Sequence, residues 1–388
     1  MVTTCPTGAS CYLYVACGCN QVLCARAAGS DGSVGTGGSD ATGGGLAGRT
    51  VTGGTTDSGG TANSGGMTVS SGTTSAGGTT TAGGTTVSGG SSGGVSGRGG
   101  GQSSCAGLTT MCGPSSESCC KSLLVPGGTF YRSYDGADYM DKSYPATVAD
   151  FYLDKYEITV GRFRQFVKAG MGTQFNPPAV GAGAHPLIAG SGWDSTWNTN
   201  LHANAADMEA AVKCDAGHQT WTDTAGSNES KPMNCLDWYT AFAFCAWDGG
   251  RLATEAEWNY AACGGSEQRY YPWSSPATST TIDDSYAVYC GGSCRAQMVG
   301  SRSPKGDGKW GHSDLAGNVE EWTLDWYSSS YPTPCDNCSE LTSASDRVVR
   351  GGSFYYGAEF LLSDYRYNFS DPKIPSLTIG ARCARTSP

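Results

Sequence analysis

Cysteine is the residue type with the most obvious chemistry here, because 18 cysteines occur in 388 residues. Several stand in close pairs: Cys17 and Cys19, Cys119 and Cys120, Cys290 and Cys294, Cys335 and Cys338. An even number of closely paired cysteines is typical of disulfides in an exported protein. Proximity in the sequence predicts the bridges Cys214–Cys235 and Cys335–Cys338.

Two other uses of these cysteines stay open. Cys290 and Cys294, followed by Cys335 and Cys338, could supply four thiolates to zinc at a loose ribbon-like spacing. Cys335-Asp-Asn-Cys338 also has the spacing of a redox pair, although no βαβ pattern surrounds it.

The elements that must position these residues occupy only part of the chain. Gly, Ser and Thr dominate between Gly29 and Gly101, and all 10 Trp lie at or after Trp193. A segment without large apolar side chains cannot bury enough surface to offset its conformational entropy. The predicted divisions are a small Cys-rich segment over 1–28, a disordered Gly/Ser/Thr tether over 29–104, a Cys-rich junction over 105–122 and one globular domain over 123–388.

Charge and hydropathy exclude several partners and favour an exported protein. The net charge is −10 and no Lys/Arg cluster occurs, so nucleic acid and anionic membranes are disfavoured. No apolar run reaches the roughly 18 residues of a transmembrane segment. Residues 1–24 lack the pattern of a signal peptide, yet the cysteine usage predicts an extracellular, periplasmic or cell-surface location.

Three helices are predicted from their caps and stop signals. Each begins with a residue whose side chain can accept from the first turn, and each ends at glycine. The predicted boundaries are Thr159 to Gly170, Asp237 to Gly249, and Thr254 to Gly264. Thr254 and Glu257 also form a capping-box pattern. The rest is rich in Gly, Asn and Tyr, which predicts an α+β domain with short strands and long loops.

Two similar turns lie near the ends of the domain. Val125-Pro-Gly-Gly-Thr-Phe130 and Val349-Arg-Gly-Gly-Ser-Phe354 share a Gly-Gly step followed by a hydroxyl residue and Phe. This repetition predicts that the strands following the first turn and flanking the second are neighbours.

Six motifs in order resemble the formylglycine-generating enzyme (sulfatase-modifying factor) family over about residues 123–386. They are Leu153-Asp-Lys-Tyr-Glu-Ile-Thr159, Pro232-Met-Asn-Cys-Leu-Asp-Trp238, Gly250-Arg-Leu-Ala-Thr-Glu-Ala-Glu-Trp258, Leu315-Ala-Gly-Asn-Val-Glu-Glu-Trp322, Arg350-Gly-Gly-Ser-Phe354 and Ile379-Gly-Ala-Arg-Cys383. The resemblance implies a C-type-lectin-like fold with little regular secondary structure.

The resemblance also implies a copper site, held by two cysteines shortly after the GGS turn, for oxidation of a sulfatase cysteine to formylglycine. Two soft thiolates suit Cu(I). Here Tyr356 and Leu361 stand at those positions, and no cysteine occurs between Cys338 and Cys383. We therefore expect no copper site of this kind and no formylglycine-generating activity.

A calcium site is implied by the resemblance in the loop from Asp314 to Glu321. A carboxylate and alternating carbonyls in a tight glycine turn offer the hard oxygen ligands that Ca²⁺ prefers. The expected ligands are the side chain of Asp314, the carbonyls of Leu315, Gly317 and Val319, and the carboxylate of Glu321. Alternatively, Asn318 and Glu321 brace the turn without a metal. A second family calcium site is lost, because Val288 replaces its Asn.

Two further expectations concern cysteines and histidines. The resemblance implies a Cys245–Cys383 disulfide and leaves Cys263 without its family counterpart. Related sulfoxide synthases have an iron site built partly from histidines. The four histidines here are His185, His202, His218 and His312, and we expect loop or surface residues rather than an iron site.

The segment after the GGS turn is expected to line a groove. Its candidate residues are Ser353, Tyr356, Glu359, Asp364 and Arg366, with Tyr355, Tyr365, Tyr367, Trp322 and Trp326 nearby. A tyrosine-rich cleft with carboxylates and an arginine suits a polar ligand such as a peptide or a glycan. Glu359 and Asp364 could also form an acid/base pair.

Three functions follow from these patterns. The favoured one is a non-oxidase binding or accessory protein with a calcium-stabilised fold, secreted or displayed at the cell surface, because a long tether gives reach rather than catalysis. The alternatives are an enzyme of unknown chemistry that uses the polar groove, and a formylglycine-generating oxidase with unrecognised thiols.

Overall fold

The computed structural model describes residues 9–16, 19–26, 103–291, 294–367 and 370–387, with backbone alone for the first two ranges. Those two ranges pair as an antiparallel hairpin of β1 (Ala9–Ala16) and β2 (Cys19–Arg26). Residues 29–102 of the predicted tether lie outside the described residues.

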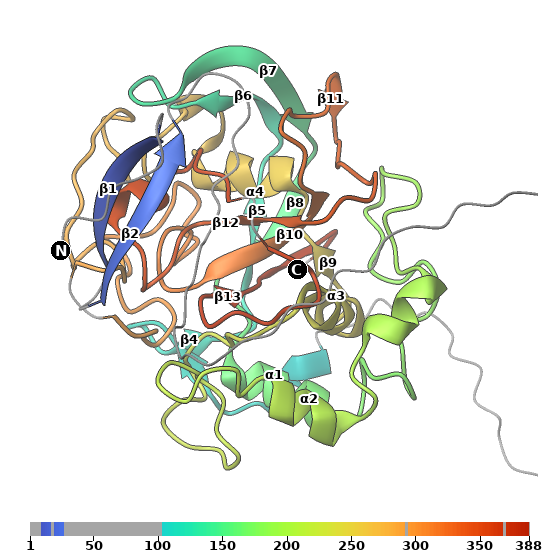
Figure 1. Cartoon of the computed structure of the whole chain (residues 1–388). Helices are drawn as coiled ribbons and strands as arrows, with labels where there is room; N and C mark the ends of the chain where they lie inside the picture. The colour runs from blue at the N-terminus through green and yellow to red at the C-terminus, as the bar shows by residue number, and fades with distance from the viewer. Residues whose placement is uncertain (1–8, 17–18, 27–102, 292–293, 368–369, 388) are drawn as a thin grey trace, which may run out of the picture.

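The domain combines short helices with small sheets and long connections (Figure 1). The helices are α1 (Val160–Lys168), α2 (Ala205–Ala211), α3 (Trp238–Trp247) and α4 (Glu255–Ala262), with 3-10 turns at Ser103–Cys105, Ser195–Asn200, Gly265–Glu267 and Ala358–Phe360. The strands are β3 (Met111–Cys112), β4 (Glu117–Ser118), β5 (Ser122–Val125), β6 (Gly128–Tyr134), β7 (Met140–Val148), β8 (Phe151–Asp154), β9 (Arg251–Leu252), β10 (Glu320–Trp326), β11 (Cys335–Asp336), β12 (Arg347–Arg350), β13 (Ile379–Gly380) and β14 (Cys383–Arg385). The α+β class is confirmed, and none of the helices among these residues is long and apolar enough to cross a membrane.

The larger sheets have the strand orders β5-β8-β14-β9, β12-β10-β13 and β11-β7-β6. The last strand, β14, therefore lies in one sheet with β5, at the start of the domain. The prediction from the two Gly-Gly turns is wrong, since β6 and β12 belong to different sheets. Gly351 and Gly352 adopt positive φ values of 98° and 63°, which the first turn does not require. The two Gly-Gly segments therefore share residue types but adopt different backbone turns.

The three predicted helices are confirmed with their caps. Asp237 accepts from the Thr240 N–H at 2.8 Å at the start of α3. Thr254 and Glu257 form both halves of the capping box of α4. Helix α2 was not predicted, because its Ala-rich sequence carries too few apolar residues to show a periodic face.

The core is largest around α3, which is buried on all sides from Trp238 to Cys245. Phe244 stacks on Phe163 of α1 with ring centroids 6.1 Å apart. Helix α4 contacts β10 and β12 on one side and the β6–β7 hairpin on the other, and it lies between them in Figure 1. Helix α4 therefore packs against strands of two sheets, and the chain after β12 leaves from this region.

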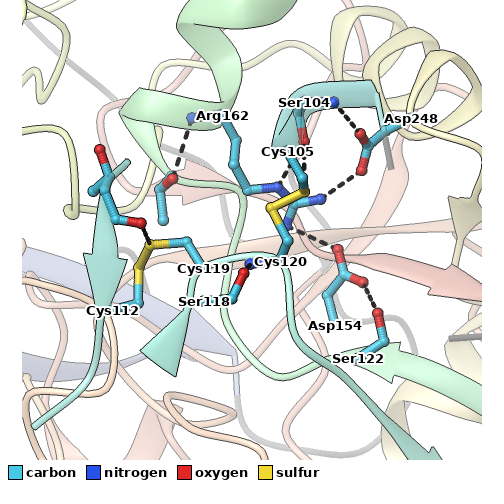
Figure 2. Close-up of a disulfide and its surroundings, with 12 residues drawn as sticks. Ser104, Cys105, Cys112, Ser118, Cys119, Cys120, Ser122, Asp154, Arg162 and Asp248 are labelled. Carbon is cyan, nitrogen blue, oxygen red and sulfur yellow. Dashed lines mark hydrogen bonds and ion pairs between the residues drawn. A yellow bond between two sulfur atoms is a disulfide. The ribbon is translucent and has the colours of Figure 1, made fainter. Parts of the chain in front are cut away.

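Residues 103–122 are packed onto this body (Figure 2). Ser104 is buried, its N–H donates to Asp248 at 2.6 Å, and its hydroxyl accepts from Arg162 at 2.9 Å. The disulfides Cys105–Cys120 and Cys112–Cys119 close the segment. The segment just before the globular domain is therefore part of the folded structure.

A buried ion-pair network lies beneath this segment. Arg162 contacts Asp154 at 2.9 Å and Asp248 at 2.6 Å. Arg385 contacts the same two carboxylates at 2.8 and 2.6 Å. Two arginines and two aspartates balance each other, which meets the desolvation cost that an unpaired buried charge would carry. The network joins α1, β8, β14 and the end of α3.

Candidate functional site

A polar pocket of about 230 Å³ opens beside the turn that follows β12. Its lining residues are Glu320, Asp346, Tyr356, Tyr367, Ser370, Asp371, Ile374, Ser376, Thr378 and Ile379. Gly352 permits the turn, since a Cβ there would lie 2.6 Å from the Phe360 carbonyl oxygen. The turn directs the chain so that Tyr356, the residue at the first expected copper position, forms one wall.

Glu320, the first residue of β10, is the most buried carboxyl of this pocket at 2% exposure. Its Oε2 accepts from the Thr378 hydroxyl at 3.0 Å. Burial raises the pKa of Glu320 to about 8, and the Thr378 hydroxyl acts in the opposite direction. Glu320 is not among the site residues predicted from the sequence. The available signal was the Glu320-Glu321 doublet, because adjacent residues of a strand point to opposite faces.

Two tyrosines complete the polar surface. The rings of Tyr356 and Tyr367 lie 6.3 Å apart. Burial raises the pKa of Tyr356 well above its usual range, with Glu320 acting in the same direction, and burial also raises the pKa of Tyr367. Both phenols therefore stay protonated at neutral pH, and each can donate and accept a hydrogen bond.

The other groove candidates take separate positions. Ser353 is buried, and its hydroxyl accepts from the Tyr355 N–H at 3.2 Å. Glu359 is exposed in the 3-10 turn Ala358–Phe360. Trp322 and Trp326 are core residues rather than groove walls.

Asp364 and Arg366 are engaged inside the protein. Asp364 is buried and accepts from Asn259 at 3.0 Å, and burial raises its pKa to about 7. Arg366 binds Glu255 at 2.5 and 2.8 Å. The expectation that Glu359 and Asp364 act as a pair is wrong, because one is exposed and the other is enclosed. The chain passes from the surface at Glu359 into the interior at Asp364, so these two residues do not line one cavity.

Positions 356 and 361 carry no thiolate for copper. Leu361 is fully buried in an apolar cluster with Tyr270 and Tyr271. Within residues 103–387 as described, Cys263 is the free cysteine, and burial raises its pKa well above the usual range. Its thiol lies 3.4 Å from the Gly265 carbonyl oxygen. A buried protonated thiol without a thiol partner offers Cu(I) no thiolate pair.

The expected calcium loop is braced by the protein in two places. Glu157 accepts from the Asn318 side chain at 2.9 Å and from the Val319 N–H at 3.1 Å. Glu321 accepts from Arg382 at 2.6 to 2.8 Å and from the Trp258 indole at 2.8 Å. Glu321 is therefore already paired with Arg382, which favours the alternative that it braces the turn without a metal.

The other four expected ligands fit a calcium ion better. Asp314 is buried, and it accepts from the Gly300 N–H at 2.5 Å. Burial raises the pKa of Asp314 to about 6. Among the described residues, no backbone N–H donates to the carbonyls of Leu315, Gly317 or Val319. No cluster of three or more His, Cys, Asp or Glu side chains converges in this part of the chain, so a site here would use mainly backbone oxygens.

The structure contains Cys214–Cys235, Cys245–Cys383 and Cys335–Cys338 disulfides. Cys245–Cys383 ties α3 to β14. The Cys335–Cys338 bond removes two of the four thiolates required by the zinc alternative.

The histidines lie apart, each with its own partner. His185 is buried and contacts Glu257 at 3.2 Å. His312 is buried, and burial lowers its pKa to about 3. Both lie in loops, as expected, but neither is at the surface. His202 contacts Asp237 and His218 contacts Asp215.

Known proteins resemble this chain over the folded domain that carries the pocket. A family profile described as "Sulfatase-modifying factor enzyme 1-like domain" matches residues 109–387. The chain is 28% identical over 302 residues to a formylglycine-generating enzyme of Mus musculus, covering 72% of this chain and 78% of that protein. It is 27% identical over 300 residues to the Mus musculus protein named "Inactive C-alpha-formylglycine-generating enzyme 2", covering 68% and 85%. The solved structure of PvdO from Pseudomonas aeruginosa aligns with a TM-score of 0.48 and 22% identity, covering 68% of this chain and 94% of that one.

Proposed function

The chain belongs to the sulfatase-modifying factor family, and we propose that it is a non-oxidase member that binds a polar ligand in the pocket at Tyr356. One observation carries this proposal: the residue at the first copper position is a tyrosine that lines a pocket with Glu320 and Tyr367. A phenol offers a ligand hydrogen bonds and an aromatic face, whereas copper chemistry would need a thiolate.

Leu361, at the second expected copper position, also supports the loss of oxidase function. Leu361 is buried in an apolar cluster with Tyr270 and Tyr271, so a hydrocarbon side chain occupies the second copper position. The enzyme alternative that relies on Glu359, Asp364 and Arg366 also loses its support. Arg366 is neutralised by Glu255, and Asp364 is enclosed beside Asn259.

The disulfides indicate an oxidising, non-cytoplasmic location, because thiols are kept reduced in the cytosol. We place the protein outside the cell, in the periplasm or at the cell surface. The Gly/Ser/Thr-rich sequence before Ser103 would act there as a tether that gives the binding domain reach.

Calcium belongs to this proposal as a structural ion. Asp314 and the carbonyls of Leu315, Gly317 and Val319 would hold it, and Glu321 would not. The ion would supply positive charge beside the buried carboxylate and so stabilise the loop that precedes β10. The ligand pocket itself contains none of these four residues.

The oxidase part of the proposal is tested with a peptide containing Cys-x-Pro-x-Arg, copper and O₂. We expect no aldehyde by mass spectrometry, with an active formylglycine-generating enzyme as the positive control. Formation of the aldehyde by the full chain would overturn the proposal.

The binding part is tested with the full chain on panels of peptides and glycans. Any ligand found is then measured with Tyr356→Ala and with Tyr131→Ala, which removes a 39% exposed tyrosine of β6 outside this pocket. We expect Tyr356→Ala to weaken binding at least ten-fold and Tyr131→Ala to leave it unchanged. Equal effects of the two substitutions would contradict a site at Tyr356.

A further inference from the structure

We infer that the pocket at Tyr356 recognises an organic cation, namely an ammonium or guanidinium group such as that of a lysine or arginine side chain. This inference rests on the proposed binding function and specifies the ligand chemistry of the same site. It follows from the charges, the walls and the size of the pocket.

The ionisable carboxyl groups of the pocket are not matched by any basic side chain of its described lining. Glu320 lies in its interior, Asp346 is half-buried and Asp371 is exposed. None of the described residues that line the pocket is Lys or Arg. The neighbouring Arg347 is engaged elsewhere, since its guanidinium lies 3.6 Å from the Trp238 ring centroid. The pocket therefore attracts cations and repels anions.

Among the described residues, Glu320 lacks an arginine partner, unlike three other buried glutamates of this domain. The buried carboxylates of Glu255, Glu257 and Glu321 each contact an arginine. The recorded hydrogen-bond partner of Glu320 within the described residues is the neutral hydroxyl of Thr378. Without a counter-charge a buried carboxyl is costly to ionise, so Glu320 gains its charge most readily when a cation binds beside it. A ligand cation entering the pocket would supply that counter-charge.

The walls of the pocket suit the same ligand. The aromatic rings of Tyr356 and Tyr367 lie 6.3 Å apart and are inclined by 37°. An aromatic face attracts a cation, and the attraction is stronger where water is excluded. The hydroxyls of Ser370, Ser376 and Thr378 add hydrogen-bond acceptors for N–H donors.

The size of the pocket limits the ligand to a small group. Its volume of about 230 Å³ lies below the roughly 300–1,000 Å³ of typical small-molecule sites. One long side chain or a small amine can enter, whereas an oligosaccharide would remain largely outside. We therefore favour a single cationic side chain over a neutral glycan as the group that fills this pocket.

The test uses the full chain and matched probes in isothermal titration calorimetry at pH 7.5. The probes are N-acetyl-lysine methylamide, N-acetyl-arginine methylamide, N-acetyl-glutamine methylamide, N-acetyl-glutamate methylamide and n-butylamine. We expect the lysine or arginine probe to bind at least ten-fold more tightly than the glutamine probe and the glutamate probe not to bind. Comparison with n-butylamine distinguishes a peptide side chain from a free amine as the source of the cation.

Three variants locate the effect. Glu320→Gln keeps the shape of the buried group and removes its charge, and Asp371→Asn does the same at an exposed position of the rim. Asp284→Asn removes an exposed acid outside the pocket. We expect Glu320→Gln to weaken cation binding at least ten-fold, Asp371→Asn two- to five-fold, and Asp284→Asn less than two-fold. Asp371→Asn keeps the test valid should Glu320→Gln fail to fold.

The outcomes separate this inference from the function on which it rests. Equal affinities for the lysine, arginine and glutamine probes would overturn the cation inference, as would equal effects of Asp371→Asn and Asp284→Asn. If a neutral ligand then binds in a manner that depends on Tyr356, the proposed binding function stands without the cation. If no ligand depends on Tyr356, both are overturned.

Discussion

The backbone N–H of Ser104 donates to Oδ1 of Asp248 at 2.6 Å, across 144 residues of sequence. The other oxygen of the same carboxylate accepts from Arg162 and Arg385, each at 2.6 Å. One buried side chain thus connects the segment ahead of the domain with α1 (Figure 2). Through Arg385 it also contacts the last strand. This contact makes the stability of the domain depend on residues that precede its first motif.

The first prediction concerns this carboxylate. Asp248→Ala leaves Arg162 and Arg385 with Asp154 as their remaining carboxylate partner. Removing one partner of a buried ion pair costs about 3–5 kcal/mol. We therefore expect a loss of this size in the free energy of urea-induced unfolding. Asp284→Ala, at an exposed position, serves as the control and should change it by less than about 0.5 kcal/mol. A loss below about 1 kcal/mol for Asp248→Ala would show that the network is not structural.

The second prediction concerns the pH dependence of stability through Asp364. Its folded pKa of about 7 lies above the usual value, since burial outweighs the opposing effects of Asn259 and Arg350. The protonated carboxyl therefore stabilises the folded state fully below about pH 4, and this contribution is lost as pH rises through 7. Each pKa unit corresponds to about 1.4 kcal/mol, so the loss amounts to a few kcal/mol.

Asp364→Asn should remove this loss, because the amide stays neutral. Unfolding free energies measured from pH 5 to 8 should fall less steeply for Asp364→Asn than for the native chain, and the variant should be the more stable of the two at pH 8. Parallel curves for the two proteins would mean that Asp364 does not titrate in this range.

The third prediction concerns calcium. Millimolar Ca²⁺ should raise the Tm of the full chain relative to excess chelator, because a ligand bound to the folded state stabilises it by mass action. Asp314→Ala should abolish the shift, whereas Glu321→Gln should preserve it even if it lowers the Tm, since Glu321 serves Arg382. An unchanged Tm of the native chain would exclude the site, and loss of the shift in Glu321→Gln would restore Glu321 as a ligand.

The sequence by itself determined the local features of this protein. The caps at Asp237 and Thr254 located two helices, because capping depends on side chains and backbone within one turn. The order of six motifs indicated the family, and the residues at 356 and 361 showed that both copper cysteines are absent. These conclusions need only residue identity and spacing.

The tertiary structure alone decided which side chains share a site. Glu321 was expected to bind a metal and instead binds Arg382, which lies 61 residues away in sequence. Asp364 and Arg366 were expected in a groove and are held by Asn259 and Glu255 from α4. Such pairings depend on long-range packing, which local patterns do not encode. Glu320 became a candidate for the same reason, because burial beside Tyr356 and the lack of an arginine partner are properties of the folded chain.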